Sequence, residues 1–242
     1  RIDSAMYWID LPQNISPRLI MLYFNEPDHT GHNKGPNSLE TLNAIEKMDS
    51  IMGYLLKEID NRKKNKNINL IILSDHGMSE VNPNNIIVLD EYLTNLNQFD
   101  IYGSGSFVQI DRKTSFKNIN LDIFNKIPNV RFYEKHQIPN QFNFKNINSG
   151  EILIVANEGY LLGEKDNLNN SLFKLKGMHG YDPENKNMHG IFYAIGPVFK
   201  KGIKVKSFEN IYIYSLICEI FNIKTYKNND NYNNFSKKNI LK

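Results

Sequence analysis

The sequence contains a single cysteine, Cys218, among 242 residues. One thiol cannot form an internal disulfide, which excludes a scaffold held together by disulfides. The cysteine count therefore does not indicate whether the protein works in an oxidising or a reducing compartment. Because Cys218 lies among apolar residues, we interpret it as a small buried hydrophobe. The sequence also has no apolar run long enough to span a bilayer, and no internal repeat that would indicate a repeat architecture.

An excess of charge of one sign is lacking as well. There are 29 basic and 26 acidic side chains, giving a net charge of +3. This balance gives no reason to expect nucleic acid binding. The basic residues at 62–66 follow a helical pattern and are interpreted as a solvated last turn that complements the helix dipole. With 40% hydrophobic residues, the chain can bury one large core.

The chemistry of the sequence is concentrated in three short clusters, residues 26–32, 74–78 and 178–180. Together they hold four of the six histidines and three carboxylates: His29, His32, His76, His179, Glu26, Asp28 and Asp75. Imidazole and carboxylate groups in this number are typical of a dinuclear zinc site.

The spacing of these residues favours a shared site. Asp28 and His32 are four residues apart, so one helical turn can direct both at one cation. Each carboxylate-bearing cluster follows an apolar run of strand length, residues 19–24 and 69–74. Buried parallel strands that end at one edge of a sheet bring such groups together. We therefore predict five metal ligands: Asp28, His32, Asp75, His76 and His179.

The remaining histidines are interpreted differently. His29 is adjacent to a predicted ligand but points elsewhere on any regular backbone, so we expect it behind the ligands or at the surface. His136 and His189 lie in polar segments where a cap or turn role is the ordinary interpretation, and we leave both out of the metal site.

The region between the clusters predicts a helix and several strands. Asn37 with Glu40 resembles a capping pair, and apolar residues recur at helical spacing from Leu39 to Ile59, which predicts a helix with a core-facing stripe. Residues 151–156 and 159–162 predict a β-hairpin. Residues 190–196 predict a return to the main sheet, and the apolar spacing after residue 211 predicts a closing helix.

At this point the motifs show a family resemblance. They are Glu26-Pro27-Asp28 with Gly31-His32, Ser74-Asp75-His76-Gly77-Met78, and His179-Gly180-Tyr181-Asp182. In order and spacing they resemble the nucleotide pyrophosphatase/phosphodiesterase family of the alkaline phosphatase superfamily, from about Tyr7 to Ile211. The resemblance implies an alkaline-phosphatase-like α/β fold with a mostly parallel sheet sandwiched by helices, incomplete at its amino-terminal end.

The resemblance also implies a ligand set and a reaction. One zinc ion would be held by Asp28, His32 and His179, and a second by Asp75, His76, a further Asp and the nucleophilic Thr. The last two belong to the family's amino-terminal half, which this sequence does not contain, so no catalytic nucleophile is assigned here. The full-length enzyme would hydrolyse nucleotide phosphodiester or pyrophosphate bonds through a phospho-threonine intermediate, and the isolated chain is expected to be inactive.

Two alternatives stay open. The first is a choline phospholipid phosphodiesterase of the same family, because the residues that select a substrate lie largely in the half that this sequence does not contain. The second is a truncated, non-catalytic zinc-binding domain. For the nucleotide phosphodiesterase and for the phospholipid phosphodiesterase alike, the expected partner is a small-molecule nucleotide or phosphodiester substrate.

The resemblance further implies a cell-surface or secreted protein, with any membrane anchoring provided by segments outside this sequence. Three glycosylation-type sequons, at Asn14, Asn169 and Asn234, permit secretion. We expect residues 1–226 to form the carboxyl-terminal part of a catalytic domain. Residues 227–242, rich in Asn and Lys, are expected to be a disordered tail.

Overall fold

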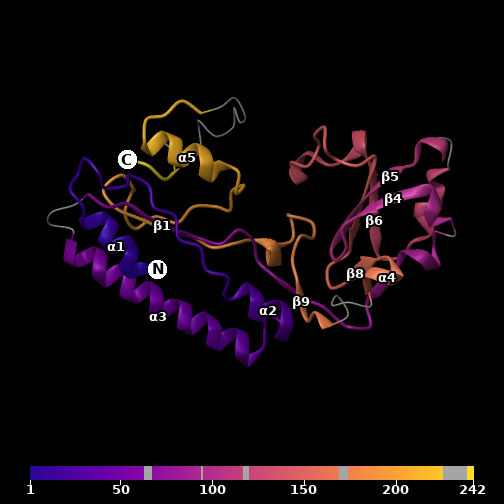
Figure 1. Ribbon diagram of the computed structural model, residues 1–242, viewed down its shortest axis with the longest axis horizontal. Helices are drawn as coiled ribbons and strands as arrows, with labels where there is room; N and C mark the ends of the chain where they lie inside the picture. The colour runs from indigo at the N-terminus through magenta and orange to yellow at the C-terminus, as the bar shows by residue number, and fades with distance from the viewer. Residues whose placement is uncertain (63–66, 94, 117–119, 169–173, 226–238) are drawn as a thin grey trace. The chain divides into compact units, whose positions relative to one another are not determined.

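The computed structural model describes residues 1–62, 67–93, 95–116, 120–168, 174–225 and 239–242 (Figure 1). The chain divides into two compact units. Unit 1 consists of residues 1–22, 52–75 and 190–242, and unit 2 consists of residues 23–51 and 76–189.

Three α-helices open the described chain, and most of its short strands follow them. The helices are α1 (Ile2–Asp10), α2 (Asp28–Lys34), α3 (Leu39–Arg62), α4 (Lys165–Leu168) and α5 (Tyr212–Ile220). The strands are β1 (Leu70–Leu73), β2 (Ser79–Glu80), β3 (Ile86–Val88), β4 (Phe99–Tyr102), β5 (Phe107–Arg112), β6 (Val130–Glu134), β7 (Ile152–Ala156), β8 (Leu161–Gly163), β9 (Gly177–Met178) and β10 (Phe192–Ile195).

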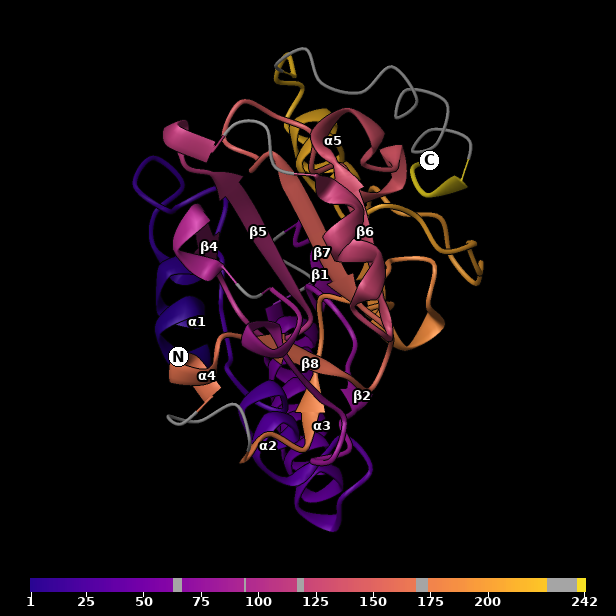
Figure 2. The ribbon, with the colours of Figure 1, turned by 90° about the vertical axis from the view of Figure 1, so that its right-hand side faces the viewer.

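Unit 2 is built on a four-stranded antiparallel sheet in the order β4-β5-β7-β6, whose long strands β5, β7 and β6 lie side by side in Figure 2. All five residues of β7 are buried, as expected for a strand with a neighbour on each side and packing on both faces. Phe124 packs in the core of this sheet and is 1% exposed. Its ring and that of Phe99 meet edge to face. Two further pairs complete unit 2, parallel β3–β8 and antiparallel β2–β9.

Unit 1 carries the antiparallel pair β1–β10, in which Leu70 faces Ile195. Helix α1 is tied to α3 by a hydrogen bond from the Tyr54 hydroxyl to Asp3 and by an ion pair between Arg62 and Asp10. A small core is formed by the buried residues Phe199, Leu216, Ile240 and Leu241.

The strand predictions are confirmed in part. The runs at 69–74 and 190–196 contain β1 and β10, which pair with each other. Residues 19–24 are extended but form no β-ladder with any described residue. A strand requires a laterally hydrogen-bonded neighbour, which an apolar run alone does not specify. The architecture is mixed α/β as predicted, and among the described strands parallel pairing occurs in β3–β8.

The predicted hairpin is wrong in its pairing, although both of its strands exist. β7 pairs with β5 and β6, whereas β8 pairs with β3. The short turn at 157–160 made a direct hairpin the simplest expectation. β7 instead pairs with β5 and β6, which are distant in sequence, and in this position all of its residues are buried. The burial of the apolar side chains of β7 favours this pairing over a local hairpin.

The long helix is confirmed as α3, but its predicted cap is wrong by one residue. Ser38 accepts a hydrogen bond from the backbone N–H of Thr41 at 3.1 Å, as an N-cap does. Asn37 instead donates to Glu80. The apolar stripe is buried at Leu55 and Ile59, while its first turns are exposed, with Leu39 at 69%.

Replacing Ser38 by alanine is expected to lower the free energy of unfolding by about 1 kcal/mol, because the first turn of α3 loses its cap. Chemical denaturation measures this change. The matched control is Ser50→Ala, since the Ser50 hydroxyl bonds to the Glu46 carbonyl in mid-helix, where alanine is a better helix former. Equal losses from both variants would show that Ser38 does not cap the helix.

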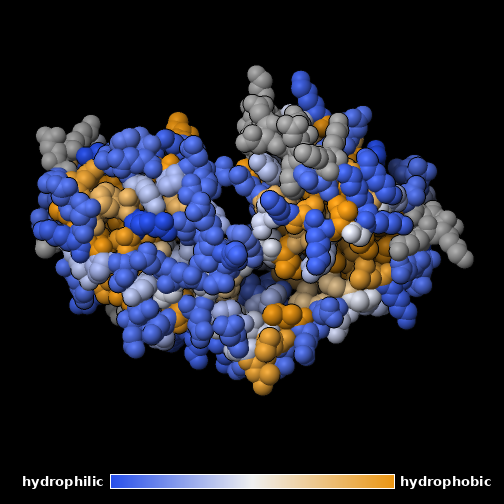
Figure 3. Space-filling view, turned by 180° about the vertical axis from the view of Figure 1, so that it is seen from behind, coloured by the Kyte–Doolittle hydropathy of each residue, from blue (hydrophilic) through white to orange (hydrophobic). Residues whose placement is uncertain are grey.

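Apolar side chains reach the surface of unit 1, which carries the carboxyl-terminal part of α3 and appears on the right of Figure 3. Tyr7, Met21, Tyr193 and Ile195 are among them. In the part of the chain that the structure describes, no helix is both long and apolar enough to cross a membrane.

The expectation of a disordered tail at 227–242 falls largely on residues outside the described ranges. Its last residues are described, and there the tail is packed: Ile240 and Leu241 are buried against Phe199 and Leu216. Leu241 also forms a bridge with Phe199. The domain boundary at residue 226 stays a prediction.

Candidate metal centre

Helix α2 presents two of the predicted ligands on one face. Asp28 opens the helix and His32 follows one turn later, so that His32 Nε2 lies 3.4 Å from Asp28 Oδ1. The Glu26 carboxylate accepts the backbone N–H of Thr30 and satisfies one donor of the first turn. One helical turn therefore brings the two side chains together, and their role as ligands of one cation stays a prediction.

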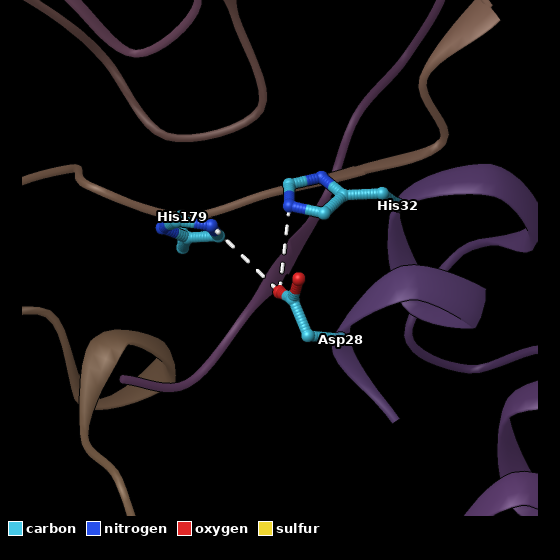
Figure 4. Close-up of side chains that lie close together, drawn as sticks. All are labelled: Asp28, His32 and His179. Carbon is cyan, nitrogen blue, oxygen red and sulfur yellow. Dashed lines mark ion pairs between the residues drawn. The ribbon is translucent and has the colours of Figure 1, made fainter. Parts of the chain in front are cut away.

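His179 reaches the same point from a distant part of the chain. It directly follows β9, and its Nε2 lies 3.7 Å from Asp28 Oδ1 (Figure 4). One ligand atom from each of Asp28, His32 and His179 lies within 4.8 Å of the others. We call these three residues the triad.

The hydrogen bonds of His32 fix its tautomer. Its Nδ1 lies 2.8 Å from the carbonyl oxygen of Gly177. A carbonyl oxygen only accepts, so Nδ1 carries the proton and donates it. In the neutral ring Nε2 is then a lone pair facing Asp28, which is the orientation that metal-bound histidines adopt when a backbone carbonyl holds the other nitrogen.

The carboxylate of Asp28 supplies the clearest sign of a cation. Its Oδ1 atom is closed to solvent and has no hydrogen-bond partner among the described residues. It faces His32 Nε2, which is an acceptor in the neutral ring, so in that form two lone pairs meet with no proton between them. A buried acceptor without a partner costs about 1–3 kcal/mol. A cation placed between these atoms removes that cost, so the triad fits a metal ion.

A fourth predicted ligand, His76, lies against the triad. Its ring stacks on that of His179, with 3.5 Å between ring centroids and 15° between planes. Its Nδ1 lies 2.8 Å from the Gly77 carbonyl, which again leaves Nε2 as the lone pair. Asp75 belongs to unit 1, whereas the other four predicted ligands belong to unit 2. Its role in a second metal site stays a prediction.

The other three histidines lie outside the triad. His29 is exposed on α2 and contacts Asn33 of its own helix. His136 and His189 are also exposed, and His189 Nε2 lies 3.2 Å from the Pro183 carbonyl.

The loop that follows His179 is held by contacts that the sequence did not reveal. The Tyr181 hydroxyl donates to the Tyr160 carbonyl at 2.9 Å, and burial raises the pKa of this phenol above its ordinary value. Asp182 forms an ion pair with Arg131 at 2.9 Å. Gly180 has φ +85°, and a Cβ there would lie 2.7 Å from the Ser106 hydroxyl. Only glycine fits this turn without strain.

Glu158 is a further residue that sequence reasoning missed. It accepts hydrogen bonds from Ser79 and Asn187, which are 79 and 29 residues away in the chain. These bonds, that from Ser79 first, lower the pKa of the Glu158 carboxyl. No local pattern predicts contacts of this sequence separation, so the residue carried no signal beyond its acidity.

Comparison with known proteins defines the class. The model of the type I phosphodiesterase/nucleotide pyrophosphatase family matches residues 1–182. Human ectonucleotide pyrophosphatase/phosphodiesterase 5 matches with a TM-score of 0.86 at 28% identity, over 99% of this chain and 62% of that one. The fold is therefore the alkaline-phosphatase-like α/β fold of these proteins. The chain belongs to the type I phosphodiesterase/nucleotide pyrophosphatase family.

The similar curated proteins are phosphodiesterases. A venom phosphodiesterase from Macrovipera lebetinus is 30% identical over 95% of this chain and 28% of its own length. Ectonucleotide pyrophosphatase/phosphodiesterase family member 1 from Rattus norvegicus is 32% identical over 96% of this chain and 26% of its own length. The chain thus spans about a quarter of the length of these two relatives.

One solved relative was determined with a nucleotide. Murine ectonucleotide pyrophosphatase/phosphodiesterase 5, as an inactive variant in complex with AMP, is 31% identical. Its TM-score is 0.81, and the match covers 94% of this chain and 60% of that chain.

Proposed function

We propose that the protein hydrolyses phosphodiester or pyrophosphate bonds of nucleotides with the help of two zinc ions. In this proposal Asp28, His32 and His179 hold one ion, and Asp75 and His76 contribute to the second. The observation that carries it is the buried Asp28 Oδ1 atom, which faces imidazole nitrogens and has no hydrogen-bond partner among the described residues.

Zinc suits this set of donors. Two imidazole nitrogens and one carboxylate oxygen are a frequent zinc ligand set, and three protein ligands leave a position open for water or substrate. The side chains of the triad are only partly exposed, between 21% and 40%, so the centre is reachable without being fully solvated.

The roles of the residues follow from their contacts. When bound, two zinc ions lower the pKa of a hydroxyl nucleophile and neutralise charge on the departing oxygen. Asp28 supplies the negative charge that holds a cation, and the Gly177 carbonyl fixes the ring of His32. By the family resemblance, a threonine nucleophile and a further Asp come from outside these 242 residues. We therefore propose a phospho-threonine intermediate in the full-length protein and little or no activity for this chain alone.

Nucleotides are the substrate class that the comparisons support, because a relative of 31% identity was solved in complex with AMP. Relatives described as ectonucleotide and venom enzymes support a cell-surface or secreted location. Both assignments are part of the proposal, as is glycosylation at the sequons.

A comparison of two chromogenic esters tests the substrate class. The protein expressed from its complete reading frame is expected to cleave the nitrophenyl ester of thymidine 5'-monophosphate faster than nitrophenyl phosphocholine. Treatment with a chelator should lower the rate at least about a hundredfold, and zinc should restore it, because metal ions supply several kcal/mol of transition-state stabilisation.

Two results would contradict the proposal. Preferential cleavage of the phosphocholine ester would assign the protein to phospholipid head groups instead of nucleotides. A nucleotide ester rate that a chelator leaves unchanged would remove zinc from the mechanism.

A further inference from the structure

Glu158 lies in the turn between β7 and β8, and a single oxygen atom of its carboxylate gathers two donors. Its Oε1 accepts the hydroxyl of Ser79 and the side-chain amide of Asn187, the latter at 2.6 Å. Ser79 is 3% exposed, so its hydroxyl depends on this acceptor. Neither donor belongs to the turn that carries Glu158.

The Ser79 side of this contact leads to two predicted ligands. Ser79 lies in β2 and faces Met178 of β9 in the antiparallel ladder. Met178 directly precedes His179, and His76 lies three residues before Ser79. The short β2–β9 ladder therefore sets the separation of the segments whose imidazole rings stack at 3.5 Å. A two-residue ladder has little stability of its own and needs side-chain support.

The Asn187 side leads to His76 by another route. Asn187 lies in the 3₁₀ helix η8 (Lys186–Met188), and the Met188 carbonyl accepts the backbone N–H of Gly77 at 2.9 Å. A Cβ on Gly77 would lie 2.1 Å from the Asn187 carbonyl oxygen, so the two backbones are in close contact. The Gly77 carbonyl in turn holds the ring of His76.

We infer that Glu158 is a positioning residue that joins β2 to η8 and thereby orients His76 and His179 for metal binding. This inference rests on the metal centre proposed above. What it requires of residue 158 is an oxygen acceptor at the Oε1 position. Because Ser79 and Asn187 both donate to that one oxygen, the carbonyl of a glutamine can accept both of them, whereas a methionine of similar length cannot. Asn185 is a further hydrogen-bond partner of the carboxylate.

The paired variants Glu158→Gln and Glu158→Met separate the acceptor from the space that the side chain fills. In the protein expressed from its complete reading frame, E158M is expected to bind Zn²⁺ about tenfold more weakly, because losing a contact that orients a metal ligand typically lowers metal affinity by at least this factor. E158Q should stay within about twofold of the unchanged protein. The visible absorption spectrum of the Co²⁺-loaded protein should change in E158M and not in E158Q, because it reports the geometry of the ligands.

Two further variants complete the experiment. Glu184→Met, at an exposed position in the loop that precedes η8, is the matched control and should leave Zn²⁺ affinity and the Co²⁺ spectrum unchanged. Ser79→Ala removes a donor from the other side of the contact and should weaken Zn²⁺ binding in the same direction as E158M.

The outcomes separate this inference from the proposed function. If the unchanged protein binds Zn²⁺ and E158M retains its affinity and Co²⁺ spectrum, the positioning role is wrong and the metal centre stands. If E158Q loses as much as E158M, the charge of Glu158 acts instead of its acceptor geometry, and the inference fails in this form. If the unchanged protein binds neither metal, the metal centre itself is wrong.

Discussion

Replacing His179 by alanine is expected to weaken zinc binding more than a hundredfold, and replacing His32 should do the same. Each change removes one of three ligands, and the loss should exceed the ten- to hundredfold that removal of a mere supporting contact causes. The remaining pair still includes Asp28, whose buried Oδ1 would keep only one imidazole neighbour. Competition against a chelator of known zinc affinity measures both variants.

The matched control for this prediction is His29→Ala. His29 lies on the same helix as His32 and next to Asp28, but it is exposed and contacts Asn33. This variant should retain zinc affinity within about twofold, because it removes neither a metal ligand nor a contact that orients one. Unchanged zinc content in both H32A and H179A would disprove the ligand assignment.

Replacing Asp28 by asparagine is expected to have opposite effects on function and stability. Zinc affinity should fall by more than about a hundredfold, because the site loses its only carboxylate ligand among the triad. The metal-free protein should become more stable by about 1 kcal/mol. The asparagine amide can donate to the lone pair of His32 Nε2, where two acceptors face each other in the present structure.

Thermal or chemical unfolding in the presence of a chelator measures the stability effect, and Asp166→Asn serves as a control on an acid of α4 outside the triad. If D28N destabilises the metal-free protein by 1 kcal/mol or more, the Asp28 carboxylate has a stabilising partner, and the argument from its unpaired oxygen is wrong. Such a result would leave the histidine predictions to be tested on their own.

Local patterns in the sequence were sufficient for several elements. The long apolar period predicted α3, and the run before Asp75 predicted β1. The four-residue spacing of Asp28 and His32 predicted their shared direction, which depends only on the geometry of one helical turn. The grouping of His179 with these two residues was implied by the family resemblance and not by a local pattern, since His179 lies 147 residues after His32.

The errors share a physical cause, which is dependence on a distant partner. The strands at 152–156 and 161–163 were recognised, yet their pairing was decided by β5, β6 and β3. The extended run at 19–24 has the composition of a strand, but a ladder is a property of two segments. Glu158 was missed for the same reason, because its donors come from two other segments of the chain.

Anomalous diffraction at the zinc absorption edge, from crystals of the protein grown with zinc, tests the central claim most directly. The account predicts a peak about 2.0–2.2 Å from Asp28 Oδ1, His32 Nε2 and His179 Nε2, the distances at which zinc binds carboxylate oxygen and imidazole nitrogen. A crystal with no zinc peak between these three residues, or with zinc bound only at an exposed histidine such as His136, would contradict it.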